Sequence, residues 1–106
     1  MGERNFSGID LSWASLQRVS LPGIDIVEGI LQGIDLRESN LQGAELMDAV
    51  FEGAKLSGAD LSNANLEGAN LAHADLRQAL LVGANLKGVN LKGTNLSGAL
   101  LQNAIF

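Results

Sequence analysis

The chain has 106 residues, enough for one domain, with 46% apolar residues, 18% charged residues and a formal net charge of −5. It has no cysteine, which excludes a disulfide framework and thiolate metal sites. No apolar run is long enough to span a membrane and nothing near Met1 is typical of a secretion signal, so we expect a cytoplasmic protein with no membrane partner. An acidic chain is also a poor candidate for binding the phosphate backbone of a nucleic acid, so no direct nucleic-acid binding is expected.

A repeat of five residues runs through the chain and never slips. Stepping by five from Phe6 to Phe106 reaches 21 central positions, of which 17 are Leu, three are Phe and one is Ile. The minus-two position is Ala in 12 repeats, the minus-one position is Asp or Asn in 12, and the plus-two position is Gly in 11. The consensus Ala-(Asp/Asn)-Leu-x-Gly covers residues 4 to 106, so we expect residues 1–106 to form a single repeat domain.

The period of five predicts short extended pieces joined by tight turns, because it matches neither a helix nor an unbroken strand. The segment from Leu21 to Ile24 places the turns, since Pro22 suits the second turn position and Gly23 supplies a positive φ at the third. Nine plus-two sites are not glycine. These sites need another turn type or a left-handed residue: Trp13, Arg18, Glu28, Glu38, Asp48, Asn63, His73, Gln78 and Asn103.

Side chains alternate along an extended piece, so the central Leu and the Ala two residues before it share the inner face. The residue between them points outward. A coil that turns once every five residues closes after four sides, which gives twenty residues per turn and about five coils in all. Residues twenty apart are then expected to stack at about 4.8 Å.

The pattern resembles the pentapeptide repeat family, and the resemblance covers residues 4 to 106 in 21 consecutive repeats. It implies an all-β fold, a right-handed quadrilateral β-helix, with the central and minus-two residues inside. It also implies a family that is abundant in cyanobacteria and mostly of unknown function. A few members of that family mimic DNA and inhibit type II topoisomerases.

The sequence contains no constellation that predicts catalysis. His73, the one histidine, occupies an outward turn position, and most of the twelve carboxylates occupy outward consensus positions. The glycines match no phosphate-binding motif and are interpreted as turn residues. We therefore expect a non-enzyme with no catalytic, cofactor-binding or metal residues.

Outward residues that break the consensus are the candidates for an interface, because contiguous exposed apolar residues often mark binding surfaces. Ile30 and Val50 replace Asp or Asn and are expected to stack, with Val27 and Met47 beside them. Leu80 and Leu100 are expected to stack on the opposite side, with Val82 beside Leu80. The candidate interface is Val27, Ile30, Met47, Val50, Leu80, Val82, Leu100, Ile105 and Phe106. The alternative is that these residues only fill a tolerant wall.

Charge is uneven along the chain. Residues 1–67 hold eleven acids and four bases, whereas residues 68–106 hold Asp75 against three bases. Like charges are expected to stack beside the apolar residues, Asp25 with Glu45 and Glu28 with Asp48. This arrangement is either a solvated wall or part of a mixed acidic and apolar partner face. On another side, Asp35, Lys55 and Asp75 alternate in sign, which favours stability.

The ends of such a rod expose backbone groups and interior Leu. Phe6 and Phe106 lie on the same side, five coils apart, and are interpreted either as partial plugs or as simple replacements of Leu. Outward Leu100 and Ile105 would leave the C-terminal end adhesive. We expect an end-to-end homodimer, or else a chain that is one piece of a longer protein.

The leading hypothesis is a non-catalytic structural or protein–protein interaction module whose protein partner and role the sequence does not identify. The alternative is a DNA-mimicking inhibitor of a type II topoisomerase such as DNA gyrase.

Overall fold

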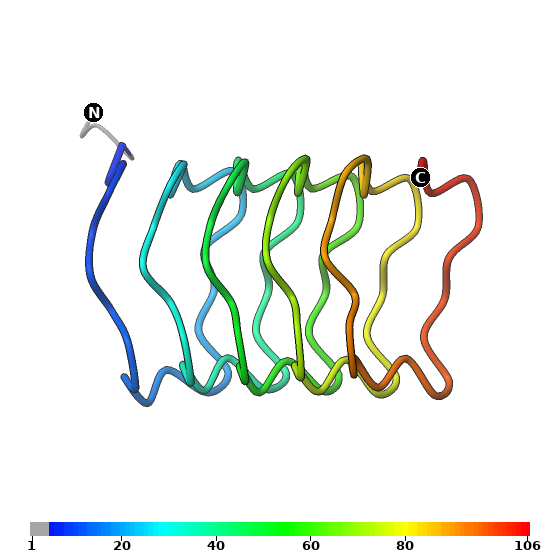
Figure 1. Cartoon of the computed structure of the whole chain (residues 1–106), viewed down its shortest axis with the longest axis horizontal. Helices are drawn as coiled ribbons and strands as arrows, with labels where there is room; N and C mark the ends of the chain where they lie inside the picture. The colour runs from blue at the N-terminus through cyan, green and yellow to red at the C-terminus, as the bar shows by residue number, and fades with distance from the viewer. Residues whose placement is uncertain (1–4) are drawn as a thin grey trace.

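The computed structural model describes residues 5–106, which coil into a four-sided rod (Figure 1). The rod is 35 Å long and 26 by 25 Å across, so its cross-section is nearly square. The first described residues lie at one end of the rod, and the C-terminal coil forms the other end. Arg4, the minus-two residue of the first repeat, lies outside the described residues.

The only strand-like elements in residues 5–106 are parallel bridges one residue long, and this part of the chain contains no helix. Every bridge joins two minus-one residues twenty positions apart, from Asn5 with Asp25 to Asn85 with Ile105. The predicted coil of twenty residues is therefore confirmed. The expected all-β class is confirmed in part, because the sides of the rod contain isolated bridges rather than longer strands. Tight turns at every fifth residue leave room for one bridge residue per side.

Each side of the rod is named by its bridge residues. The first side carries residues 5, 25, 45, 65, 85 and 105, and the second carries 10, 30, 50, 70 and 90. The third side carries residues 15, 35, 55, 75 and 95, and the fourth carries 20, 40, 60, 80 and 100. The plus-one and plus-two residues that follow a side form the corner after it.

Every corner in the described chain is a turn with a left-handed residue at its third position. All nine non-glycine plus-two residues have φ between 57° and 65°, and the plus-two glycines have φ between 65° and 73°. At Trp13 this φ places a bulky residue in a conformation that L-amino acids rarely adopt. The left-handed alternative is confirmed, and another turn type is not used, because the bridge register leaves every corner the same geometry.

Backbone hydrogen bonds join the turns and the coils in one repeated pattern. The minus-two N–H donates to the central carbonyl oxygen across the turn, as Ala64 does to Leu61 at 3.0 Å. The central N–H donates to the next coil, as Leu66 does to Asn85 at 2.8 Å. Because these bonds recur from coil to coil, each coil is stabilised mainly by hydrogen bonds to its two neighbours.

The core is a stack of central Leu and minus-two Ala side chains that runs from Ile24 to Leu86. Leu66 and Phe51 are fully buried, and Ala at the minus-two position fills the narrow space beside each central residue. The predicted inward set is confirmed. The apolar residues of the first and last coils are only partly buried, since each lacks one neighbouring coil.

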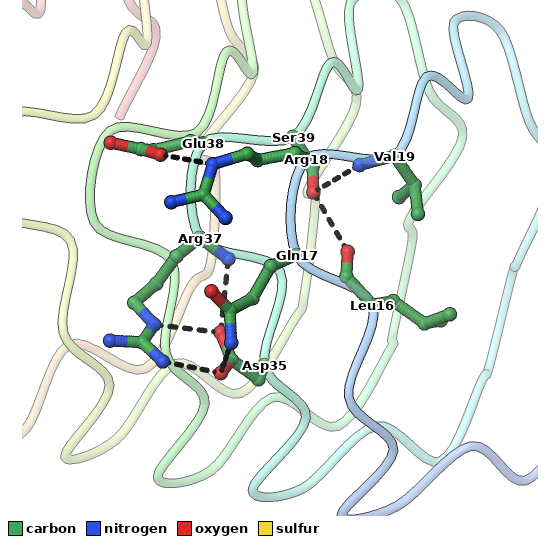
Figure 2. Close-up of polar contacts among 8 residues, drawn as sticks. All are labelled: Leu16, Gln17, Arg18, Val19, Asp35, Arg37, Glu38 and Ser39. Atoms are coloured by element: carbon green, nitrogen blue, oxygen red, sulfur yellow. Dashed lines mark hydrogen bonds and ion pairs between the residues drawn. The ribbon is translucent and has the colours of Figure 1, made fainter.

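Two inward hydroxyls interrupt this apolar stack without leaving a polar atom unpaired. Ser39 is buried, and its Oγ accepts from the Val19 N–H at 3.2 Å and donates to the Leu16 carbonyl oxygen at 3.0 Å (Figure 2). The hydroxyl thus bridges the turn from Leu16 to Val19, where other turns close directly. Thr94 similarly donates to the Leu71 carbonyl oxygen at 2.7 Å.

Candidate interaction surface

One backbone N–H in each repeat, that of the plus-one residue, has no backbone partner in this pattern. The minus-one Asp or Asn supplies one, because its Oδ1 accepts from that N–H two residues later. Asn70 accepts from Ala72 at 3.0 Å, and Asp60 accepts from Ser62 at 3.0 Å. Such side-chain caps satisfy a donor at a turn. All twelve consensus residues make this bond: Asn5, Asp10, Asp25, Asp35, Asn40, Asp60, Asn65, Asn70, Asp75, Asn85, Asn90 and Asn95.

The minus-one residues that are neither Asp nor Asn provide no such cap, whether they are apolar or polar. Within residues 5–106, the N–H groups of Gln32 and Glu52, which follow Ile30 and Val50, have no hydrogen-bond partner. The N–H groups of Gln17, Met47 and Ser57, which follow Ser15, Glu45 and Lys55, also lack a partner among residues 5–106. Ser20 also lacks the consensus side chain, but Pro22 has no N–H to satisfy. An apolar residue at this position therefore forgoes a hydrogen bond worth about 0.5–1.5 kcal/mol.

Ile30 and Val50 form a bridge and lie one above the other on the second side, as predicted. Ile30 is 41% exposed and Val50 is half-buried. Val27 and Met47 lie on the corner before this side, and both are half-buried. We call these four residues the Ile30–Val50 surface.

Carboxylates border the Ile30–Val50 surface along the first side and its corner. Asp25 bridges Glu45, and the left-handed residues Glu28 and Asp48 follow on adjacent coils. None of these four carboxylates makes an ion pair within the described chain. The predicted stacking of like charges is therefore present in the bridge register, and the border stays negatively charged.

The second predicted apolar cluster lies on the opposite side of the rod. Leu80 bridges Leu100, and Val82 follows on the corner after the fourth side. Ile105 bridges Asn85 on the first side and is 55% exposed. Phe106 lies at the C-terminal end and is 66% exposed.

The N-terminal end of the rod contains an apolar depression of about 190 Å³. Its lining includes Phe6, which remains 43% exposed. Neither terminal Phe ring therefore seals the end at which it lies.

Trp13 is a candidate that the consensus analysis did not select. It lies on the corner after the second side and is 73% exposed. Its ring covers Gly33 on the next coil, because a Cβ at position 33 would overlap the ring atoms. An aromatic residue at an outward, left-handed turn position was the sequence signal that could have found it.

The third side is a ladder of charge pairs. Arg37 Nε and Nη2 donate to the two carboxylate oxygens of Asp35 at 2.9 and 2.7 Å (Figure 2). These bonds lower the pKa of Asp35 to about 2. Asp35 bridges Lys55, which bridges Asp75, so the predicted alternation of sign is confirmed.

Two further pairs extend this polar wall. Arg77 holds Asp75 through the same two contacts, at 2.9 and 2.7 Å, and lowers its pKa. Arg18 pairs with Glu38 at 2.9 Å on the corner (Figure 2). Since these arginines are each matched by an acid, the wall is suited to stability more than to binding an anion.

No group of three or more His, Asp or Glu side chains in residues 5–106 could hold a metal ion. The His73 ring lies over Gly93 on the next coil, where a Cβ at position 93 would overlap it. No helical segment in this range has the length and apolar character that a membrane crossing requires.

A comparison with family models matches the description "Pentapeptide repeats (8 copies)" over residues 5–43, 30–68, 44–83 and 69–106. These matches together cover the described chain. A search of curated proteins finds no match.

Several solved structures have the same fold. A trypsin-treated variant of QnrB1, a plasmid-mediated fluoroquinolone resistance protein, is 28% identical with a TM-score of 0.86 over 96% of this chain and 52% of its own. A pentapeptide repeat protein of the Arabidopsis thaliana thylakoid lumen is 34% identical, with a TM-score of 0.62 over 90% of this chain and 59% of its own. One from the cyanobacterium Cyanothece 51142 is 30% identical, with a TM-score of 0.51 over 97% and 91%. The chain thus spans little more than half the length of the first two.

Proposed function

The chain belongs to the pentapeptide repeat family, and we propose that it is a non-catalytic interaction module that binds a protein partner through the Ile30–Val50 surface. The right-handed sense of the quadrilateral β-helix and a cytoplasmic location are parts of this proposal. The similarity to QnrB1 supports the handedness.

The observation that carries the proposal is that stacked apolar side chains, Ile30 and Val50, take the place of capping residues on an exposed side. An Asn at either position would satisfy the N–H of Gln32 or Glu52, as Asn70 does for Ala72. Instead, the chain keeps apolar side chains on an exposed side. Proteins commonly give up stability in this way where a residue serves binding.

A preference of β-branched residues for bridge positions is the competing explanation. It does not account for Leu80 and Leu100, which also occupy bridge positions but are not β-branched. The Ile30–Val50 surface is favoured over the Leu80–Leu100 pair because it lies beside both an exposed Trp and uncompensated acids. Aromatic residues are enriched among the residues that dominate binding energy.

A random-peptide display selection on the immobilised chain tests the proposal. Selected peptides are expected to bind the parent and to lose binding to the double variant Ile30→Asn/Val50→Asn. The matched control is Leu80→Asn/Leu100→Asn, which makes the same change on the opposite side. If the selected peptides bind the two double variants equally, the Ile30–Val50 surface is not the interface.

A DNA-mimicking inhibitor of a type II topoisomerase is the second candidate. The acids at residues 25, 28, 45 and 48 and the similarity to QnrB1 favour it, whereas the excess of bases in residues 68–106 disfavours it. A DNA gyrase supercoiling assay separates the two functions. Dose-dependent inhibition would support this candidate, and no effect at roughly tens of micromolar, a range of weak specific binding, would exclude it.

A further inference from the structure

A groove of about 340 Å³ lies on the corner after the second side, next to the Ile30–Val50 surface. Trp13, Gln32, Glu52, Gly53 and His73 line it. The Trp13 ring lies on Gly33, while the space above Gly53 on the following coil is open, with nothing within 4 Å of a Cβ built there. The groove therefore forms because Gly33 and Gly53, on the next two coils of the same corner, have no side chain to fill the space beside Trp13.

The lining favours a cation. One face of the Trp13 ring lies against Gly33, and the side chain as a whole is 73% exposed. A Lys or Arg side chain is attracted to an exposed aromatic face and forms charge-assisted hydrogen bonds with a carboxylate. Glu52 is exposed in the same groove and makes no ion pair within residues 5–106. The uncompensated acids along the first side add to the negative field around it.

The neighbouring backbone favours a peptide as the carrier of that cation. The free N–H groups of Gln32 and Glu52 lie on successive coils between the apolar pair and the groove, where they can donate to carbonyl oxygens of a partner. Ile30 is two residues from Gln32, and Val50 is two residues from Glu52. In an extended peptide, side chains two residues apart point the same way.

We propose that the groove holds a Lys or Arg side chain of a protein partner, while an apolar residue two positions away in the same extended segment packs on Ile30 and Val50. This assignment rests on the proposed function and names the chemistry of the partner.

The probe is acetyl-Leu-Ser-Arg-Ser-Leu-amide, compared with the same peptide carrying citrulline, the neutral isostere of Arg. Trp13, the one tryptophan in the chain, reports binding by its fluorescence. The Arg peptide is expected to bind about tenfold or more tightly than the citrulline peptide at low salt, and the difference is expected to shrink as salt rises. Equal binding of the two peptides, or no binding of either, would overturn the proposal.

Variants place the cation in the groove. Trp13→Gly introduces the consensus turn residue, so the fold is expected to hold, and Glu52→Gln removes one charge. Calorimetry measures the affinity of each variant for the two peptides. Each of these variants is expected to lose most of the preference for the Arg peptide over the citrulline peptide, whereas Leu80→Asn is expected to preserve it. A preference that survives Trp13→Gly would place the cation elsewhere and overturn the assignment.

The display selection separates failure of this inference from failure of the proposed function. Selected peptides that depend on Ile30 and Val50 but carry no Lys or Arg would overturn the cation site and leave the interaction surface standing. Selected peptides that ignore Ile30 and Val50 would overturn both.

Discussion

The Cγ2 methyl of Ile26 occupies the space that a Cβ at position 29 would need, and position 29 is glycine. Ile26 is the one β-branched residue at a central position, and Gly29 stands where most repeats have Ala. Gly29 does not have a positive φ, unlike the plus-two glycines. Its lack of a side chain is therefore explained by packing against Ile26.

Gly29→Ala is expected to destabilise the chain by roughly 1–3 kcal/mol through overpacking. In an Ile26→Leu background the same change is expected to cost much less, because Leu does not branch at Cβ. Urea unfolding of the two single variants and the double variant measures the coupling. Additive effects would show that the contact does not explain the glycine.

Leu66, which is fully buried in the middle of the stack, is expected to carry a large share of local packing. Leu66→Ala should cost about 2–5 kcal/mol, because it loses transfer free energy and leaves a cavity. Leu66→Asp should abolish folding, since an unpaired charge would enter the core. Thermal melts test both, with Glu67→Gln on the surface as the control; a normal melt for Leu66→Asp would refute the inward assignment.

Restoring caps is expected to hold or raise stability. Ile30→Asn and Val50→Asn each supply an acceptor for a free N–H, worth about 0.5–1.5 kcal/mol, and the loss of β-propensity offsets part of this gain. Ser20→Asn is the matched control and should gain nothing from capping, because Pro22 offers no N–H. Unfolding of the Ile30→Asn/Val50→Asn variant at the growth temperature would show that these residues are structural.

The pair of Asp35 and Arg37 predicts a loss of stability in acid. The Arg37 bonds hold the pKa of Asp35 at about 2, below its ordinary 3.8. A lowered folded-state pKa contributes stability that is present above about pH 4 and is lost as the pH falls toward 2. Asp35→Asn keeps an acceptor for the Arg37 N–H but loses the charge. Its melting temperature should lie below the parent at pH 6 and converge with it near pH 2, and a constant difference would contradict this origin.

End-to-end association of the isolated chain is expected to run head to tail. On the last coil, the Leu91 N–H has no partner among residues 5–106, while on the first coil the Asp10 carbonyl oxygen accepts no bond. When two copies stack end to end, the donors at the C-terminal end of one copy therefore meet the acceptors at the N-terminal end of the next. Each added copy leaves a new free end, so such contacts continue beyond a dimer. Sedimentation at several concentrations should show a weight that rises steadily and falls with Phe106→Ala. A monomer of 11.1 kDa at every concentration would show that the ends do not associate.

The five-residue period by itself determined the coil length, the inward and outward positions and the corners. The physical reason is that a four-sided coil of twenty residues buries a Leu and an Ala in every repeat and also pairs the backbones of successive coils. The stacking of Ile30 on Val50 and of Leu80 on Leu100 followed from the same arithmetic, because residues twenty apart are neighbours.

Only the tertiary structure decided which groups lack partners and where side chains lean across coils. The consensus does not show that the minus-one Asp or Asn caps an N–H two residues later, so the cost of Ile30 at that position was invisible in the pattern. The Trp13 ring covers Gly33, and Ser39 bridges a turn of the preceding coil. These contacts depend on side-chain direction between coils, which a period in the sequence does not specify.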